Sequence, residues 1–247
     1  MKFKIYSVAI LLLLSLIIII GCNKEDDPIL KPKVFPVYDI DGNGYDTVVI
    51  GTQVWLKQNL RTTHYRNGDS LENETNGSKW TNKTVGIYCY YNNLTSGADT
   101  FGCLYNHYAV QDSRNICPEG WHIPSIAEWD SLVSFLENNN YGFNGGGEDI
   151  AKSLATSYGW VSENTTSGTV GHYQELNNLS GFSAPPSGQR VGFGVFGEKG
   201  KRSVYWSSNL YYTYAAYYVS LNYNYSYVSK NTTQFFSGFC IRCIKDK

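Results

Sequence analysis

Cysteine is the residue type in this chain whose chemistry depends most directly on position. Cys240 and Cys243 are separated by two residues, which is the spacing of a dithiol that can cycle between reduced and oxidised forms. Such a site normally opens a helix, where the local environment lowers the thiol pKa. Only four residues follow Cys243, too few for that helix. We therefore expect both cysteines to lie in a terminal strand and to be structural.

The first cysteine, Cys22, follows a segment with the features of an export signal. Lys2 and Lys4 precede an apolar run over residues 8–20, and Gly21 is a small residue placed directly before Cys22. We expect residues 1–21 to be removed as a lipoprotein signal peptide, because the end of the run resembles a bacterial lipobox, in which the cysteine carries lipid. The alternative is a transmembrane anchor, for which the run is marginal in length.

Residues 22–37 have the composition of a tether. Residues 23–27 are polar and acidic, and Pro28, Pro32 and Pro36 favour an extended chain after them. An acidic stretch directly after a lipidated cysteine resembles the surface-export signal of Bacteroidota lipoproteins, and a solvated linker is the alternative. We expect a protein that a lipid anchors in the outer membrane and that is exposed at the cell surface.

An exported chain can keep disulfides, and five cysteines remain when Cys22 is lipidated. Cys89 and Cys103 flank a turn-rich segment, as cross-strand partners would. Cys117 precedes the main predicted helix and Cys243 lies in the last strand. Cys240 is the cysteine that we expect to be left over. The full connectivity stays open at this point.

Other residues that could carry chemistry show no catalytic or metal-binding spacing. The four histidines are scattered, so we expect neither a metal site nor a cofactor: His64, His107, His122 and His172. Six acidic residues could supply the carboxylate pair of a glycoside hydrolase, although nothing in the sequence brings two of them together: Glu119, Glu128, Glu148, Asp149, Glu163 and Glu175. A hydrolase or transferase is therefore an alternative function.

Residues 39–46 alternate carboxylates with glycines, as a calcium loop does. The flanking residues are strand-like, and the twelve-residue ligand pattern with a terminal glutamate is missing. Asp41-Gly42 and Asn43-Gly44 instead favour a hairpin turn.

Tyrosine supplies the best candidate for binding. Residues 217–227 predict a strand that places alternate tyrosines on one face, and exposed aromatic rings can stack on sugars or provide rigid contact area. The alternative is that these rings form core and cover a sheet edge, with cross-strand pairs adding stability. The candidate binding residues are Tyr211, Tyr212, Tyr214, Tyr223, Tyr225 and Tyr227.

Composition bounds both the fold and the partners. The full chain has 247 residues, 15% of them aromatic, with 21 Tyr and 24 Gly and few charges, a pattern that suits short strands and tight turns and excludes a helical bundle. After removal of the signal, the chain is long enough for one large domain. The net charge of −1 gives no electrostatic case for nucleic acid.

Two helices are expected to position these residues among strands. Ser125 and Glu128 form a capping box at the start of the first helix, and an apolar face runs along it until Asn138-Asn139-Asn140. The second helix is predicted over residues 148–158. Strands are expected before and after the helices, at 47–50, 53–60, 85–91, 101–110, 204–208, 217–227 and 238–244, with a short helical turn as the alternative at 53–60. This order predicts an α+β fold.

Five blocks in a fixed order resemble the Fibrobacter succinogenes major paralogous domain over residues 38–247. The blocks are Asp39–Asn43 leading into Ile50–Trp55 and Asn59-Leu60; Leu104–Ala109; Cys117–Ser125 with Glu128-Trp129; Gly181–Ala184; and Tyr205–Ser208 with Gly238–Cys243. The resemblance implies a surface or secreted bacterial domain without an established activity.

The same blocks are similar at a distance to C-type-lectin-like folds, including the branch with formylglycine-generating enzymes. The Glu-Pro-Asn and Trp-Asn-Asp motifs of calcium-dependent sugar binding are missing, and so are the paired catalytic cysteines of the oxidases. We therefore expect a single lectin-like domain that binds glycan or a surface protein. A structural or adhesive envelope component is a further alternative.

Overall fold

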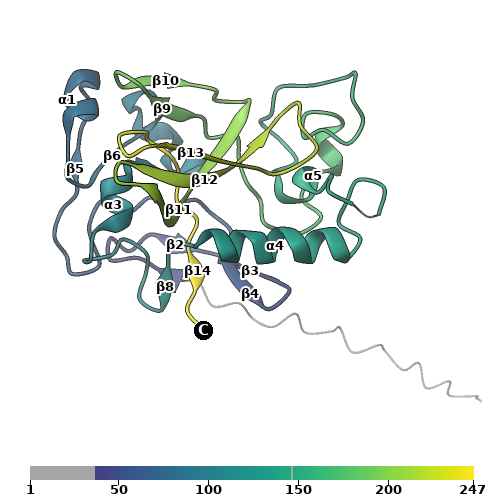
Figure 1. The fold of residues 1–247 in the computed structure, drawn as a ribbon, viewed down its shortest axis with the longest axis horizontal. Helices are drawn as coiled ribbons and strands as arrows, with labels where there is room; N and C mark the ends of the chain where they lie inside the picture. Colours follow the sequence, from purple (N-terminus) through teal and green to yellow (C-terminus); the bar gives the residue numbers. More distant parts are fainter. Residues whose placement is uncertain (1–36, 146) are drawn as a thin grey trace, which may run out of the picture. The chain divides into compact units, whose positions relative to one another are not determined.

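The computed structural model describes residues 37–145 and 147–247, which belong to one compact unit. The strands are β1 (Val37–Tyr38), β2 (Gly44–Tyr45), β3 (Thr47–Ile50), β4 (Gln53–Leu56), β5 (Glu72–Asn73), β6 (Ile87–Cys89), β7 (Leu104–Tyr105), β8 (Trp121–His122), β9 (Gln189–Val191), β10 (Val195–Gly197), β11 (Arg202–Tyr212), β12 (Ala215–Asn222), β13 (Ser229–Gln234) and β14 (Ile244–Lys245). The helices are α1 (Gly77–Asn82), α2 (Ala98–Phe101), α3 (His107–Gln111), α4 (Ile126–Asn138) and α5 (Ala151–Leu154), with 3-10 turns η1 (Tyr91–Asn93), η2 (Thr95–Gly97) and η3 (Gln174–Leu176). The fold is mixed and strand-rich, as the predicted α+β class requires (Figure 1).

The predicted signal peptide, the lipidation site at Cys22 and all but the last residue of the predicted tether lie outside the described residues. Within the described ranges, the helices are all too short or too polar to cross a membrane.

The C-terminal segment connects the sheets to one another. Gly238 pairs with Arg190 of β9, Phe239 with Tyr105 of β7, and Cys240 with β11. The segment then enters the four-stranded sheet β3-β4-β14-β8, where Ile244 lies between β4 and β8. Figure 1 shows this yellow segment running through the middle of the molecule to the C-terminus. The strand predicted over residues 238–244 is therefore not continuous, since residues 238–240 form isolated bridges and only Ile244 belongs to β14, but the segment joins several sheets.

Helix α4 forms where the sequence predicts it. The Ser125 hydroxyl accepts a hydrogen bond from the Glu128 amide at 3.3 Å, and the Glu128 carboxylate accepts one from the Ser125 amide at 2.8 Å. This reciprocal capping box satisfies two backbone donors that the first turn of a helix leaves free. The buried side chains of Trp129, Leu132 and Leu136 form the apolar face.

The other helices differ from the prediction. The expected helix over residues 148–158 is only the single turn α5, because Ala155 is extended and pairs with Ala184. Helix α1 lies between the predicted strands 53–60 and 85–91, where no helix is predicted, and α3 lies within the predicted strand 101–110. Asn76 and Asn106 cap these helices with their side chains, a local signal that the strand-like composition of the region obscures.

The predicted tyrosine strand over residues 217–227 is also shorter than expected. Strand β12 ends at Asn222, and the amide of Tyr225 donates to the Asn222 carbonyl in a turn. The alternation of tyrosines continues in the sequence, but Asn222, Asn224 and Ser226 lie between them, and Asn and Ser favour turns. Residues 39–46, in contrast, form the predicted hairpin, with β1 paired to β2.

Two arginines lie in the core without a carboxylate partner among the described residues. The guanidinium of Arg242 stacks over Phe182 and Tyr205, at 4.6 and 5.4 Å, and donates to carbonyl oxygens. Arg190 lies over Trp80 and donates to main-chain carbonyls of the β5–α1 connection. Because buried charges need hydrogen-bond partners, each arginine fixes the loops that supply its acceptors.

Candidate functional site

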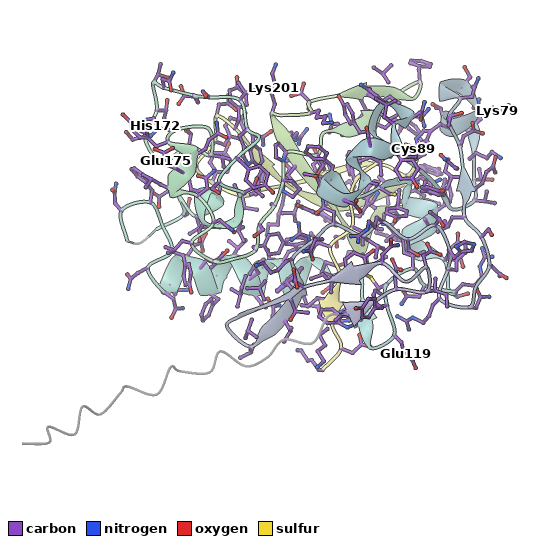
Figure 2. All side chains as sticks on the ribbon, turned by 180° about the vertical axis from the view of Figure 1, so that it is seen from behind. Lys79, Cys89, Glu119, His172, Glu175 and Lys201 are labelled. Carbon is purple, nitrogen blue, oxygen red and sulfur yellow. A yellow bond between two sulfur atoms is a disulfide. The ribbon has the colours of Figure 1, made fainter. Side chains whose placement is uncertain are left out.

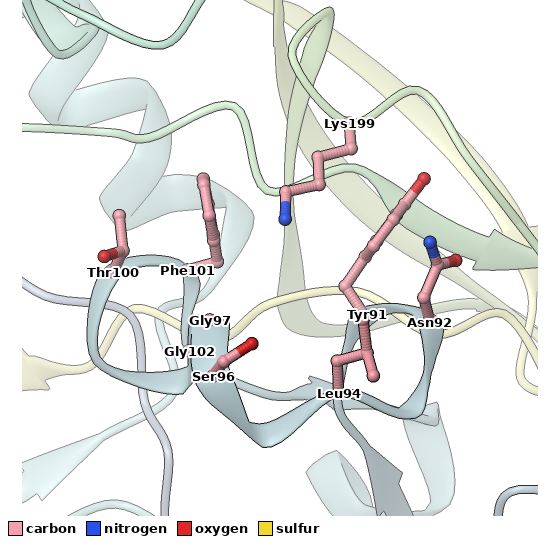
Figure 3. Close-up of a pocket in the computed structure, with 9 residues that line it drawn as sticks. All are labelled: Tyr91, Asn92, Leu94, Ser96, Gly97, Thr100, Phe101, Gly102 and Lys199. Atoms are coloured by element: carbon pink, nitrogen blue, oxygen red, sulfur yellow. The ribbon is translucent and has the colours of Figure 1, made fainter.

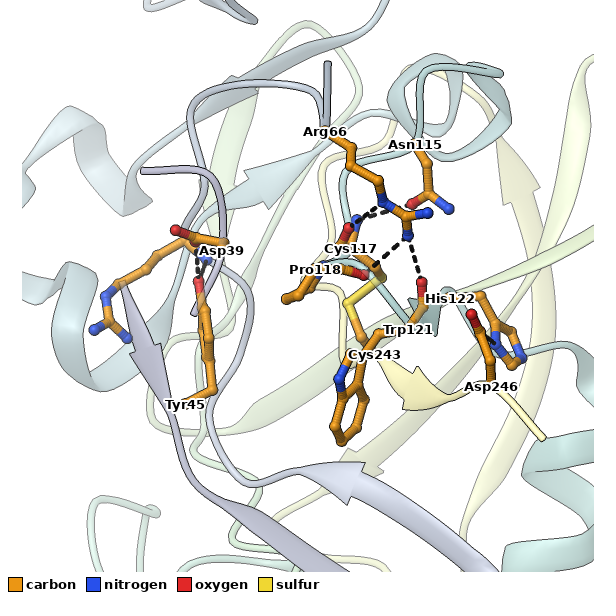
Figure 4. Close-up of a disulfide and its surroundings, with 11 residues drawn as sticks. Asp39, Tyr45, Arg66, Asn115, Cys117, Pro118, Trp121, His122, Cys243 and Asp246 are labelled. Atoms are coloured by element: carbon orange, nitrogen blue, oxygen red, sulfur yellow. Dashed lines mark hydrogen bonds and ion pairs between the residues drawn. A yellow bond between two sulfur atoms is a disulfide. The ribbon is translucent and has the colours of Figure 1, made fainter. Parts of the chain in front are cut away.

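One disulfide closes the domain. Cys117 and Cys243 are bonded, with Cα atoms 6.0 Å apart, so both belong to a bridge as predicted. Arg66 holds the loop around Cys117 by donating to the carbonyls of Cys117, Pro118 and Trp121 (Figure 4). Because Cys243 is bonded to Cys117, Cys240 and Cys243 do not form a dithiol pair, although only two residues separate them. The disulfide ties the start of β8 to the last strand.

The predicted bridge between Cys89 and Cys103 is wrong. Both thiols are free and buried, and so is Cys240, the expected leftover. Strands β6 and β7 are antiparallel with Cys89 opposite Leu104, so Cys103 is one residue out of register. Successive side chains point to opposite faces of a strand, and the two cysteines therefore pack in different core clusters.

The candidate tyrosines divide into two groups at opposite ends of β12. Tyr211, Tyr212 and Tyr214 form the tip of the β11–β12 hairpin together with Leu210, and these four side chains are 50 to 70% exposed. The rings of Tyr211 and Tyr212 contact each other, with 5.7 Å between their centroids. We call these four residues the hairpin tip. It lines none of the hollows described below.

The second group follows β12. Tyr225 and Tyr227 are 40 and 46% exposed and stack face to face, with ring centroids 5.0 Å apart. Tyr223 is half-buried against the core. The structure therefore does not bring the six candidate tyrosines into one surface.

A large hollow lies between the β3–β4 hairpin and helix α4. Its volume is about 670 Å³, within the range of about 300–1,000 Å³ typical of ligand sites. The rings of Phe135 and Tyr141, 6.1 Å apart, form its aromatic wall. The remaining lining is amide, hydroxyl and apolar, with no charged residue. We call this hollow the α4 groove.

The polar groups of the α4 groove are held in place by the helix. The side-chain amide nitrogens of Asn138 and Asn139 each donate to a helix carbonyl at 2.7 Å, and Gln53 donates to the Glu128 carbonyl at 2.9 Å. These bonds fix the amide planes. Within the described ranges, the Asn138 and Asn139 side-chain oxygens accept no hydrogen bond from another side chain or amide, so both can accept one from a ligand hydroxyl.

A second, smaller hollow of about 180 Å³ lies beside η1 and η2. Figure 3 shows Lys199 reaching down between Phe101 and Tyr91. The ammonium nitrogen of Lys199 is 4.2 Å from the Phe101 ring centroid and 5.3 Å from that of Tyr91. Asn92, Ser96 and Thr100 supply polar groups around it. We call this hollow the Lys199 pocket.

A glycine permits the close packing that forms the Lys199 pocket. Gly188 has a φ of +72°, and a Cβ there would lie 2.6 Å from the Tyr91 ring and 2.8 Å from the Lys199 amide. The two walls can therefore approach only because residue 188 has no side chain. Asn92 also adopts a positive φ, +53°, which turns the chain at the edge of the pocket.

The acidic candidates are dispersed, as the distance between Glu119 and Glu175 in Figure 2 illustrates. Two hollows are lined by two carboxylates, Asp39 with Glu119 and Glu128 with Asp246. In each pair one acid already has structural hydrogen bonds: Asp39 accepts four within its own hairpin, and Glu128 caps helix α4.

His122 links the second carboxylate pair. Its ring nitrogens lie 2.6 Å from Asp246 and 2.9 Å from Glu128. Burial lowers the pKa of His122, but the hydrogen bonds to Asp246 and Glu128 outweigh it, and the net pKa is raised. The adjoining hollow is only about 70 Å³, the volume of roughly two water molecules. His122 thus joins Asp246 in the C-terminal segment to Glu128 at the start of helix α4, and we call this contact the C-terminal clamp.

The described residues contain no cluster of three metal-ligating side chains.

The described residues form a strand-rich α+β domain that contains one disulfide. Residues 48–245 match the Fibrobacter succinogenes major domain (Fib_succ_major), and the chain belongs to this family, as its five sequence blocks predict. No match to the chain was found among curated proteins or among solved structures.

The sequence predicts neither the α4 groove nor the Lys199 pocket. The apolar positions of α4 were recognised as a core face, but Phe135 lies beside that face and lines the groove. No local sequence pattern marks Lys199 as a binding residue, because its aromatic neighbours are about a hundred residues away in the chain.

Proposed function

We propose that the protein is a lipid-anchored module at the outer surface of the outer membrane and that it binds glycan. The predicted signal peptide, Cys22 and the acidic tether support the location. The five family blocks support a C-type-lectin-like arrangement of the domain. In this proposal no calcium ion takes part, because the lectin calcium motifs are missing from the sequence.

The α4 groove is the observation that carries the proposal. A sugar presents apolar C–H faces and a ring of hydroxyl groups, so it is bound best by aromatic walls edged with fixed amides and hydroxyls. Phe135 and Tyr141 provide the aromatic wall. Asn138 and Asn139 provide the amides, and Ser134 provides a hydroxyl. A hollow buries more of a ligand than exposed side chains at the end of a hairpin do, which favours the groove over the hairpin tip for a glycan.

The hairpin tip fits the second candidate, a protein partner. Tyr and Leu exposed on a rigid hairpin give large contact area at low entropic cost. A hydrolase or transferase is less well supported, because the carboxylates that share a hollow are used in the β1–β2 turn, the α4 cap and the C-terminal clamp.

A glycan-array experiment on the soluble chain 28–247 tests the proposal. We expect glycan binding that Ser134→Trp abolishes by filling the groove. Tyr141→Ala should weaken binding by about tenfold, because a stacked ring contributes roughly 0.5–1.5 kcal/mol beyond its buried area. Tyr158→Ala removes a more exposed ring that lies outside the groove, and it is the control for the loss of an aromatic side chain.

The hairpin-tip variant Tyr212→Ala/Tyr214→Ala separates the two surfaces. Retained glycan binding in this variant supports the α4 groove. Loss of binding in this variant, with Ser134→Trp behaving as wild type, moves the site to the tip and contradicts the groove. Release of shortened glycans from the array would instead establish catalysis.

A further inference from the structure

We propose that the Lys199 pocket is a separate binding site for a saccharide that carries a carboxylate, such as a uronic acid. The proposal goes beyond the α4 groove, because the two hollows share no residue and differ in charge. Lys199 is the only charged residue that lines the Lys199 pocket.

The charge of Lys199 is available to a ligand. No hydrogen bond or ion pair joins its ammonium group to another described residue, whereas Lys83, Lys152 and Lys230 all have such partners. A lysine ammonium has three donor protons. The neighbouring acid Asp99 is paired with Arg61 at 3.4 Å and does not line the pocket.

The rings on both sides direct this charge into the pocket. Cation–π attraction to Phe101 and Tyr91 holds the ammonium group between the two rings. The Lys199 side chain is exposed, and its ammonium group lies beside both rings rather than against a carboxylate of the described residues. The close approach that Gly188 permits therefore fixes a cation at the mouth of a small hollow.

The other lining groups select the rest of the ligand. About 180 Å³ is the volume of roughly six water molecules, which suits one sugar ring and excludes a longer chain from full burial. Leu94 and the Tyr91 and Phe101 side chains give the pocket apolar lining for the C–H faces of such a ring. Ser96, Thr100 and Asn92 provide hydroxyl and amide groups for its hydroxyls. A carboxylate on the ring then receives a charge-assisted hydrogen bond from Lys199.

Calorimetric titration of the soluble chain 28–247 with glucuronate, glucose and glutamate tests the proposal. We expect glucuronate to bind more tightly than glucose or glutamate, and its affinity to fall as salt rises. Lys199→Met keeps the apolar stem and should weaken glucuronate binding at least about tenfold, because hydrogen bonds to charged groups are the strong ones. Lys201→Met removes a lysine from the same turn that does not line the pocket, and should change the affinity less than twofold.

Three outcomes would overturn the proposal. Equal affinity for glucose would exclude charge recognition, and equal affinity for glutamate would exclude a saccharide. Unchanged glucuronate binding in Lys199→Met would show that Lys199 does not bind the carboxylate. The groove-filling variant Ser134→Trp, titrated in parallel, should bind glucuronate normally, so that a failure of the groove proposal and a failure of this one give different results.

Discussion

The guanidinium of Arg242 donates two hydrogen bonds to the side-chain oxygen of Asn59, at 3.1 and 2.6 Å, and both side chains are buried. The two residues are 183 positions apart, so their contact joins the segment after β4 to the C-terminal segment. Asn59 also donates to the Phe101 carbonyl at 2.9 Å. The same contact thus supports the chain that forms one wall of the Lys199 pocket.

Removal of Arg242 should be strongly destabilising. Arg242→Met leaves the Asn59 oxygen and the Phe182 carbonyl without a donor, and each such buried group costs about 1–3 kcal/mol. We expect the free energy of unfolding to fall by at least about 3 kcal/mol in urea titrations. Lys245→Met, an exposed change in β14, is the control. A loss below about 0.5 kcal/mol for Arg242→Met, the range of an ordinary surface change, would contradict this account.

Reduction of the Cys117–Cys243 disulfide should lower stability substantially. The bridge spans 126 residues, and the chain-entropy estimate for a loop of this length is about 4–5 kcal/mol. Cys117→Ser/Cys243→Ser should therefore unfold at a much lower urea concentration than the oxidised wild type. Adding a reductant should lower the wild type to the same midpoint and leave the double variant unchanged.

The thiols of Cys89, Cys103 and Cys240 should be unreactive in the native protein. Burial raises the pKa of Cys89 to about 12 and that of Cys240 to about 11, and it raises the pKa of Cys103 further still. A thiol reagent at pH 8 should label none of them natively and all three after unfolding without reductant, in the chain 28–247. A single labelled thiol after unfolding would show that a second bridge exists.

Stability should depend on pH through His122. Its folded pKa is raised, so its contribution is fully present below the unfolded pKa of about 6.5 and is lost as pH rises through the higher folded value. His122→Gln should therefore cost most near pH 5.5 and least near pH 9. Because the partners are partly exposed, the difference should be about 1 kcal/mol or less. Equal losses at both pH values, measured by urea unfolding, would contradict a charged clamp.

Membrane attachment should depend on Cys22. We expect Cys22→Ser to move the full chain from the membrane fraction to the soluble fraction, and to prevent incorporation of labelled fatty acid. Cys240→Ser is the control, because that thiol is buried in the domain. Fractionation of Cys22→Ser with the membrane would favour a spanning anchor over a lipid.

Patterns that act over a few residues could be predicted from the sequence. The capping box at Ser125 and Glu128 and the turn at residues 39–44 both formed, because their hydrogen bonds join residues at most four positions apart. The five ordered blocks were enough to identify the family. Helix α5 shows the limit of this approach: an apolar pattern predicted three turns, but pairing of Ala155 with Ala184 allowed only one.

Only the tertiary structure decided which distant residues meet. A one-residue register between β6 and β7 put Cys89 and Cys103 on opposite faces, and the length of β12 separated the candidate tyrosines into two surfaces at its ends. Lys199 lies beside Phe101 and Tyr91 because Gly188, which has no side chain, lets the segments that contain Tyr91 and Lys199 approach each other. Such contacts depend on strand register and loop packing, which many weak long-range interactions fix together. The sequence alone therefore determined the family and the local elements, and the tertiary structure determined the candidate sites.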